Sequence, residues 1–173
     1  MKYAQVETPI GTLTVVAADT GIRRIVWDGE TPPDGAVEGT SDILDAAVCQ
    51  IREYFAGART TFDLPLALVG TPFQQKVWLE LGSIPFGSTI SYGEQARRVG
   101  RPQAARAVGA ANGRNPVPVV LPCHRVIGSS GALTGFGGGL DTKRTLLDHE
   151  AAVLAGMARR VPRGTDLVTL EDD

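Results

Sequence analysis

A cysteine, a histidine and an arginine stand side by side at Cys123-His124-Arg125, and together these side chains could do nucleophilic chemistry. A thiolate is a strong nucleophile, but it forms near neutral pH only beside a proton acceptor and a positive charge. Burial in the apolar run 119–121 would by itself raise the pKa of the thiol. His124 and Arg125 are candidates for both the acceptor and the charge. A small, inert core residue is the alternative for any lone cysteine.

Three prolines surround this triplet, at Pro116, Pro118 and Pro122. Each proline fixes φ and lacks a backbone donor, so we expect an extended, rigid segment over residues 115–126 and no helix. Neighbouring side chains on an extended chain point to opposite faces. His124 is therefore expected to reach the thiol through a water or a turn.

The segment Pro122-Cys123-His124-Arg125-Val126 resembles the active-site signature of the O6-alkylguanine-DNA alkyltransferases, also called methylated-DNA-protein-cysteine methyltransferases. The resemblance extends from about Thr71 to Glu150. Its other segments occur in the family's order and spacing: Ser91-Tyr92-Gly93, Ala104-Ala105-Arg106-Ala107-Val108-Gly109, Asn115-Pro116, Ser129-Ser130-Gly131 and Gly138-Gly139-Leu140.

The resemblance implies a DNA repair protein that moves an alkyl group from O6 of a flipped guanine to its own cysteine, once per molecule. It implies Cys123 as the nucleophile and His124, oriented by Glu150, as the proton acceptor acting through water. Asn115 would hold the turn near the cysteine. Tyr92 would lie against a backbone phosphate and help protonate the leaving base. No cofactor and no metal are expected.

The same resemblance implies how DNA is bound. The partner is double-stranded DNA carrying O6-alkylguanine, approached from the minor groove by a monomer, with O4-alkylthymine activity and cooperative clustering left open. DNA contacts are expected from Arg106, Tyr92, Ala105, Arg114, Arg125 and Ser129. The substrate pocket is expected to include Val126, Phe136 and Gly137. The family often has tyrosine at position 136 and in some members serine at 137, so base stacking is retained while hydroxyl contacts stay open.

Two functions of other classes also remain open. One is a DNA lesion sensor or helix-turn-helix binding module without alkyl transfer, although such sensors lack the cysteine. The other is a thiol hydrolase with a Cys-His-Glu set, which would turn over and would not need a basic helix pair.

Charge along the chain is uneven, although the 173 residues carry a net charge of only -2. Residues 91–125 hold six arginines and one acid, whereas residues 1–90 hold six basic and eleven acidic residues. A local basic patch suits one polyanion bound by one face, and a solvated helix surface is the alternative. The first residues lack an apolar signal core and no stretch reaches about 18 apolar residues, so a cytoplasmic protein without a membrane segment is expected.

The hydrophobic content of 43% is enough for a real core, and the patterns predict an α+β fold of two small lobes. Residues 1–70 are expected to form a supporting α/β lobe, with strands at 3–8, 11–18 and 21–27, a loop at 28–40, a helix from Ser41 to Gly57 and an edge strand at 62–66. Cys49 lies on that helix, where a structural role and no chemistry are expected. A zinc site is not indicated, because adjacent cysteine and histidine lack ligand spacing.

Residues 71–155 are expected to form a mainly helical lobe for DNA binding and alkyl transfer. Capping boxes at Thr71 and Ser91 predict helices to about 82 and 99, and a further helix over 102–112 completes a helix-turn-helix. The last of these helices is covered with small residues around a projecting Arg106, which suits a narrow groove and a wedge into the base stack. Two glycine-rich loops, 128–131 and 134–139, and a helix over 141–154 follow. A mobile tail is expected over 156–173.

Overall fold

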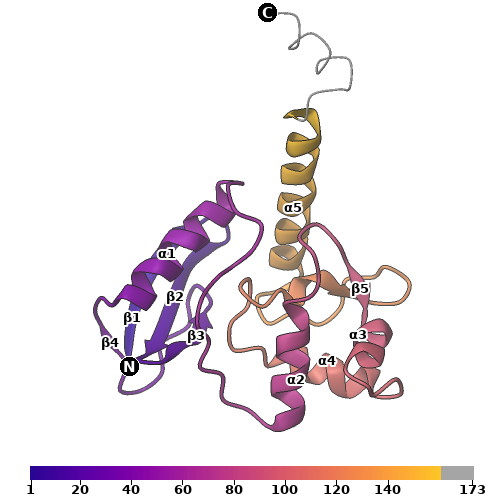
Figure 1. Cartoon of the computed structure of the whole chain (residues 1–173), viewed down its shortest axis with the longest axis horizontal. Coiled ribbons are helices and arrows are strands. Elements are labelled where there is room, and N and C mark those ends of the chain that lie inside the picture. The colour runs from indigo at the N-terminus through magenta and orange to yellow at the C-terminus, as the bar shows by residue number, and fades with distance from the viewer. Residues whose placement is uncertain (161–173) are drawn as a thin grey trace, which may run out of the picture.

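A computed structural model describes residues 1–160 as two lobes that lie side by side (Figure 1). The N-terminal lobe contains β1 (Lys2–Thr8), β2 (Gly11–Ala18), β3 (Gly21–Val26), β4 (Val37–Glu38) and α1 (Asp42–Phe55). The C-terminal lobe contains α2 (Pro72–Leu81), β5 (Ile90–Ser91), α3 (Tyr92–Arg98), α4 (Ala105–Gly113), the 3-10 turn η1 (Cys123–Arg125), β6 (Val126–Ile127) and α5 (Leu140–Arg160). The predicted α+β class, with a small sheet lobe before a mainly helical lobe, is confirmed.

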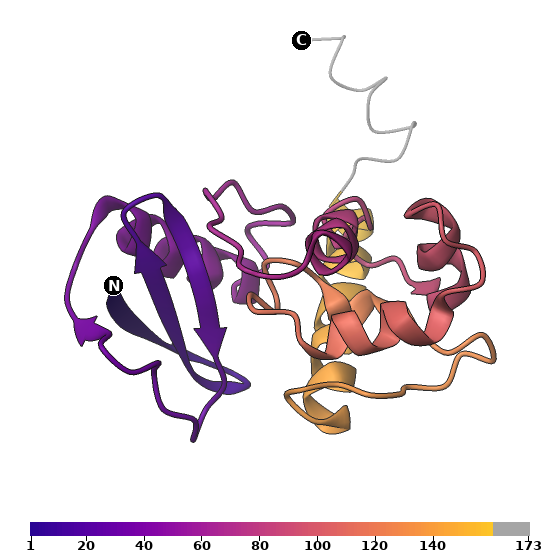
Figure 2. The ribbon, with the colours of Figure 1, turned by 90° about the horizontal axis from the view of Figure 1, so that it is seen from below.

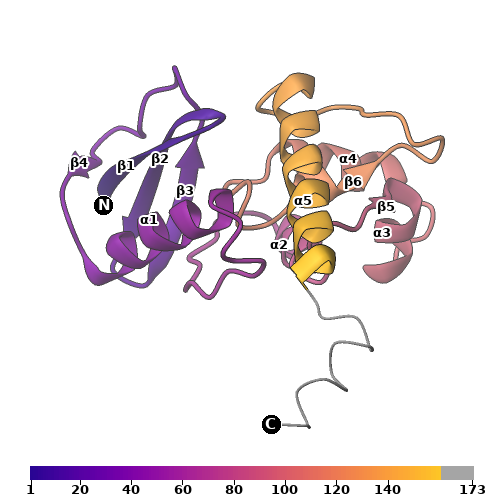
Figure 3. The ribbon, with the colours of Figure 1, turned by 90° about the horizontal axis from the view of Figure 1, so that it is seen from above.

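The N-terminal sheet has the strand order β3-β2-β1-β4. Its first three strands form the predicted antiparallel meander, whereas β4 pairs parallel to β1 inside the stretch expected to be a loop. Two exposed residues carry no hydrophobic pattern, which is why β4 could not be predicted. Helix α1 covers one face of the sheet (Figure 3) and begins as predicted, with Ser41 Oγ accepting a hydrogen bond from Leu44 N at 3.2 Å.

The prediction of an edge strand at 62–66 is wrong, because this segment forms only a single β-bridge. Ile22 and Leu66 form an isolated parallel pair, with Ile22 N donating to Pro65 O and Ala67 N donating to Ile22 O. Pro65 has no N–H, so a regular ladder cannot extend along this segment.

The helix pair of the C-terminal lobe differs from the prediction at two helix starts. Ser91 caps α3, but the Glu94 side chain binds arginines of the same helix instead of closing the capping box. Helix α4 begins at Ala105 rather than at 102, because a turn follows Gly100, which has φ of +78°. Gln95 and Asn112 then lock α3 to α4 through reciprocal amide hydrogen bonds of 2.7 and 3.2 Å. The Thr71 capping box is complete, as predicted.

One continuous apolar core joins the two lobes. It runs from the sheet and α1, through Trp78 and Leu81 of α2, to Cys123 and to Leu146 of α5. Backbone pairing reinforces it, since Ile25 N on the free edge of β3 donates to Pro116 O at 2.8 Å. Burying each large apolar side chain contributes about 1.5–3 kcal/mol, so the lobes stabilise one another.

Helix α5 continues to Arg160, six residues past its expected end. The first five residues of the tail predicted at 156–173 are therefore helical, and residues 161–173 lie outside the described part. Within residues 1–160 no helix is both long enough and apolar enough to cross a membrane.

Candidate active site

Cys123, His124 and Arg125 form one turn of 3-10 helix, which corrects the expected extended segment. Proline is tolerated before the first turn, and Pro122 O accepts a hydrogen bond from Arg125 N at 3.0 Å. Successive side chains on a 3-10 helix are about 120° apart. Cys123 and its two neighbours therefore point to different surroundings.

Asn115 closes the loop that leads to this turn. Its Nδ2 donates to Leu121 O at 2.8 Å, and its Oδ1 accepts from Val117 N at 3.0 Å. Val119 within the loop has φ of +73°, a left-handed conformation that is strained for a β-branched residue. The buried Val119 side chain and the Asn115 hydrogen bonds together keep the loop in this strained conformation. Asn115 thus bonds to the backbone of the loop before Cys123, and its role in the reaction stays a prediction.

The Cys123 thiol is 7% exposed and belongs to the shared core. Burial raises the pKa of Cys123 to about 11, against the lowering influence of the Asn115 hydrogen bond, the Lys143 charge and the nearby N–H groups of Cys123 and His124. The free thiol is accordingly neutral near pH 7. A base must take its proton before it can act as a nucleophile.

Lys143 is a site residue that the sequence analysis missed. It is fully buried, and its Nζ donates to Val126 O at 2.6 Å and to Thr134 O at 3.1 Å. Burial lowers the pKa of this amine, although the neighbouring Cys123 favours its charged form. A lysine on the apolar stripe of a helix, three residues before Leu146, was the available signal. The positive charge near the thiol therefore comes from Lys143.

His124 is fully buried, and its Nε2 lies 2.7 Å from Glu150 Oε2. An ionised carboxylate can only accept, so Nε2 carries the proton and Nδ1 presents a lone pair. Burial lowers the pKa of His124, while the Glu150 hydrogen bond opposes that shift. Nδ1 is buried and has no hydrogen-bond partner within residues 1–160. A neutral imidazole with one free nitrogen can serve as a base.

Glu150 is the most heavily bonded group of the site. Besides His124, it accepts from Arg125 Nε at 2.8 Å and Nη2 at 3.0 Å, Gly87 N at 3.0 Å and Tyr54 Oη at 2.6 Å. Burial alone would raise the pKa of Glu150, but the hydrogen bonds from His124 and Arg125 outweigh it and hold the pKa well below its usual range. The carboxylate is therefore ionised at any pH where the protein would work.

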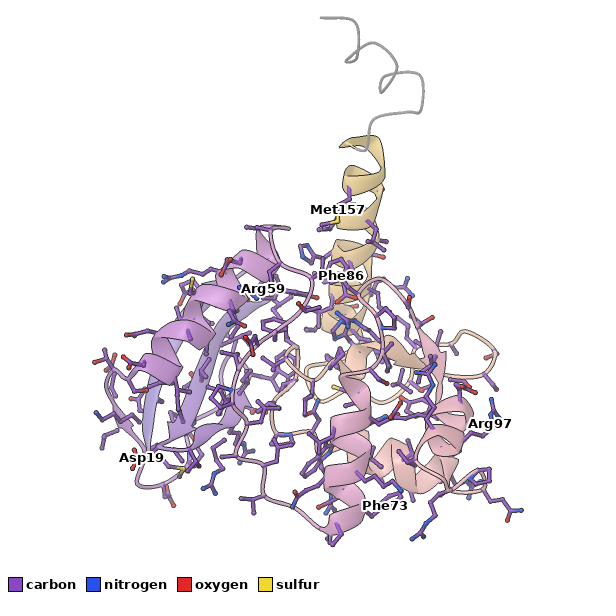
Figure 4. All side chains as sticks on the ribbon, in the orientation of Figure 1. Asp19, Arg59, Phe73, Phe86, Arg97 and Met157 are labelled. Atoms are coloured by element: carbon purple, nitrogen blue, oxygen red, sulfur yellow. The ribbon has the colours of Figure 1, made fainter. Side chains whose placement is uncertain are left out.

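Arg125 is buried, contrary to the expectation that it contacts DNA. It is 6% exposed, and its guanidinium binds Glu150 and donates from Nη1 to Ile84 O at 2.7 Å. The guanidinium carbon also lies 5.5 Å from the ring centre of Phe86, which Figure 4 shows beside α5. A buried charge needs a partner, and the Glu150 carboxylate provides it. Arg125 thus holds the carboxylate in place.

Tyr54 was also missed as a site residue, because its position on the apolar stripe of α1 indicated only a core role. Burial and the nearby Glu150 carboxylate raise the pKa of Tyr54 well above its usual range, so the phenol remains a donor. A buried tyrosine hydroxyl normally needs a hydrogen-bond partner, which was the available signal. The partner lies 96 residues further along the chain.

Of the other residues expected to contact DNA, all except Ser129 lie on or near α4. Arg106 is exposed on this helix, Ala105 is its first residue, and Arg114 follows its last residue. Figure 2 shows α4 on the face seen from below. Ser129 is exposed in a loop, and half-buried Tyr92 donates from its hydroxyl to Thr134 O at 3.1 Å.

The residues expected in the substrate pocket divide into two groups. Phe136 is half-buried, with its ring edge-on to Trp27 at 5.4 Å, and Gly137 is exposed. Val126 is fully buried on β6, so its side chain belongs to the core and does not line an open pocket. Trp27 was not anticipated here, and it approaches so closely that a Cβ at Gly138 would lie 3.0 Å from its ring.

Cys49 is exposed on α1, with its Sγ 3.3 Å from Glu53 Oε1, so its side chain adds nothing to the core, and the expectation that it does no chemistry stays a prediction. The hydrogen bond and charge of Glu53 raise the pKa of this thiol. In the described part of the chain, no group of three or more histidine, cysteine or acidic side chains is placed to hold a metal ion.

Comparison with known proteins gives consistent matches over both lobes. Residues 1–68 match the family model described as "6-O-methylguanine DNA methyltransferase, ribonuclease-like domain", and residues 72–152 match "6-O-methylguanine DNA methyltransferase, DNA binding domain". The methylated-DNA–protein-cysteine methyltransferase of Mycolicibacterium paratuberculosis is 50% identical over 153 residues, covering 87% of this chain and 92% of that protein. The Mycobacterium leprae protein of the same name is 60% identical over 146 residues, covering 83% and 88%.

A solved structure has a similar fold. The crystal structure of Mycobacterium tuberculosis OGT in complex with DNA has a TM-score of 0.83 and 45% sequence identity, covering 88% of this chain and 94% of that one.

Proposed function

This chain belongs to the 6-O-methylguanine DNA methyltransferase family and repairs methylated DNA by alkyl transfer to a cysteine of its own, and we propose that Cys123 is that cysteine. The observation that carries the proposal is the buried set formed by Cys123, His124 and Glu150 around one 3-10 turn. Cys49 has no such surroundings, since its neighbour is a carboxylate that disfavours the thiolate. The lesion we infer is O6-alkylguanine in double-stranded DNA.

Activation of the thiol begins with His124. We infer that Nδ1 accepts the proton of Cys123 through a water, and that the imidazolium so formed is stabilised by Glu150 through Nε2. The thiolate is stabilised by the charge of Lys143 and by the Asn115 amide, which both lower the pKa of the thiol. These contacts offset part of the burial that disfavours charge.

Transfer is then one displacement at the alkyl carbon. The sulfur of Cys123 forms a bond to carbon as the bond from carbon to O6 breaks, and that electron pair remains on the guanine. A proton returned to the leaving base, with help from Tyr92, leaves normal guanine. The thioether product has no leaving group that water would displace readily, so each molecule acts once.

Access to O6 requires the base to leave the stack. We propose that α4 enters the minor groove, with its small residues allowing close approach and Arg106 filling the place of the extruded base. Ala105, Arg114 and Ser129 would contact the DNA backbone nearby. The flipped base would lie against Phe136 and Gly137, in the loop whose Thr134 O accepts a hydrogen bond from Tyr92.

We propose that residues 71–155 carry DNA binding and alkyl transfer and that residues 1–70 support this lobe. The relatives named as methyltransferases favour transfer over a lesion sensor or a thiol hydrolase. We propose a monomer that works in the cytoplasm, with cooperative binding to DNA left to measurement.

The test is the mass of the intact protein after incubation with duplex DNA containing O6-methylguanine. We expect a stoichiometric gain of one methyl group in the wild type, located on Cys123 by peptide mapping, and no gain in Cys123→Ser. Cys123→Ser should still bind duplex DNA, which shows that the variant is folded. A methyl group gained by Cys123→Ser would refute the assignment of the nucleophile.

A further inference from the structure

A solvent-open cleft of about 560 Å³ lies where the two lobes meet. Strand β3 contributes Arg23 and Arg24 to its lining, and the segment after α4 contributes Arg114 and Asn115. Trp27, which follows β3, also lines it. Both lobes therefore build this cleft, and one of its sides directly continues the helix that we place in the groove.

The cleft carries positive charge that forms no ion pair among the described residues. Arg23, Arg24 and Arg114 take part in no ion pair within residues 1–160, and Arg23 Nε is buried there without a hydrogen-bond partner. Exposed arginines of α3, by contrast, pair with a glutamate one turn away. Among the described residues that line the cleft, Glu30 has the only carboxylate. Guanidinium groups without partners are ready donors for an anion.

The arginines of β3 are held in a fixed place relative to α4. The hydrogen bond from Ile25 N to Pro116 O joins the edge of β3 to the loop that follows this helix. Arg114 lies eight residues after Arg106, about 12 Å along a helix axis, which is the rise of three to four base pairs. Figure 2 shows the strands and α4 together on the face seen from below.

We propose that Arg23, Arg24 and Arg114 bind a phosphodiester of the DNA backbone, so that the N-terminal lobe takes part in DNA binding. The proposal rests on the placement of DNA against α4 given above. Arginine forks match phosphate oxygens in pairs, and such contacts fix the position of a protein on a duplex without reading its sequence. The cleft holds the flanking backbone while Arg106 acts at the lesion.

The experiment is the salt dependence of duplex binding by the double variant Arg23→Ala/Arg24→Ala. The arginines share one phosphate, and each lost phosphate contact lowers the slope of log Kobs against log salt by about 0.9, so we expect a decrease of about 0.9. The rate with free O6-alkylguanine base should not change. Arg52→Ala is the matched control, an exposed arginine on α1 across the sheet, and should keep the wild-type slope. The double variant Arg23→Lys/Arg24→Lys should restore most of the slope.

The outcomes separate this proposal from the placement of DNA on α4. An unchanged slope in the alanine variant, with duplex binding still weakened by Arg106→Ala, overturns the cleft alone. If neither the double alanine variant nor Arg106→Ala changes duplex binding, the placement of DNA on α4 is wrong. If inorganic phosphate raises the melting temperature of the wild type but not of the double variant, while both bind DNA with the same slope, the ligand is a small phosphate and the DNA assignment is wrong.

Discussion

The two lobes differ in what they show at the level of sequence and in what they contribute to the site. The C-terminal lobe carries a short motif in which three reactive residues are neighbours. The N-terminal lobe has no such cluster, yet it places Tyr54 on the Glu150 carboxylate and Trp27 against Phe136. The comparison shows that a short motif identifies a candidate reacting group, whereas the residues that position it can come from any part of the chain that the core connects.

Glu150→Gln tests the C-terminal lobe and should have the largest effect. We expect alkyl transfer to slow by about 10²-fold, because an amide holds and stabilises the His124 imidazolium far less well than a carboxylate. The free energy of unfolding should also fall by about 3–5 kcal/mol, since Arg125 would remain buried without its counter-charge. Single-turnover rates below the melting temperature of the variant separate the slower transfer from the lost stability. An unchanged rate would mean that Glu150 does not assist His124 in the reaction.

The same variant makes a prediction about pH. The pKa of Glu150 is depressed in the folded protein, so its stabilisation is fully present above the unfolded value of about 4.3 and is lost as pH falls towards the folded value. Wild-type stability should therefore fall more steeply than that of Glu150→Gln below about pH 4. Denaturant titrations between pH 3 and 7 measure this difference, and parallel curves would contradict the burial of an ionised Glu150.

Arg106→Ala sharpens the contrast between DNA binding and chemistry within the C-terminal lobe. We expect repair of duplex DNA to fall about tenfold or more, because filling a vacated stack is worth about 1–3 kcal/mol. Reaction with free O6-alkylguanine base needs no flipping and should be nearly unchanged. Rates at saturating protein on both substrates test this, and equal losses on both would exclude a role in the stack.

Tyr54→Phe tests whether the N-terminal lobe is only a scaffold. We expect a several-fold slower transfer to both duplex and free base, because Glu150 Oε2 loses one of the donors that fix it. Removing this hydrogen bond should cost about 1–3 kcal/mol of stability. Tyr3→Phe, on β1 of the same lobe, is the matched control and should behave as wild type. A wild-type rate and pH profile in Tyr54→Phe would show that the N-terminal lobe only supports the site.

Cys49→Ser should have the smallest effect. The residue is exposed on α1 and its neighbours disfavour the thiolate, so alkyl transfer and stability should match wild type within about 0.5 kcal/mol. Mass analysis after alkylation would show the modification at Cys123 alone. A loss of transfer with the fold intact would mean that the two thiols are coupled.

Elements with local signals could be predicted from the sequence. The meander follows from turn residues and alternating strands, and Thr71 begins α2 through its own capping box. The 3-10 turn at Cys123 could not be predicted, because the prolines around it favour extended backbone and only the surrounding core and Asn115 fix its course. The burial of Arg125 could not be predicted for a similar reason, since local charge does not reveal that this side chain pairs with a carboxylate 25 residues further along the chain.

Glu150 has a consequence for the order of folding. Its partners lie on α1, on the loop before β5 and on η1, all of which precede α5 in the chain, and Tyr54 is 96 residues away. Such distant contacts form late, because the loop between them must close first. A chain that has not yet docked α5 lacks the Glu150 carboxylate beside His124, and in the proposed mechanism its Cys123 thiol then has no oriented base. On the proposed assignment, Cys123 becomes reactive only as α5 docks, so a partly folded chain keeps its thiol free of the alkyl group.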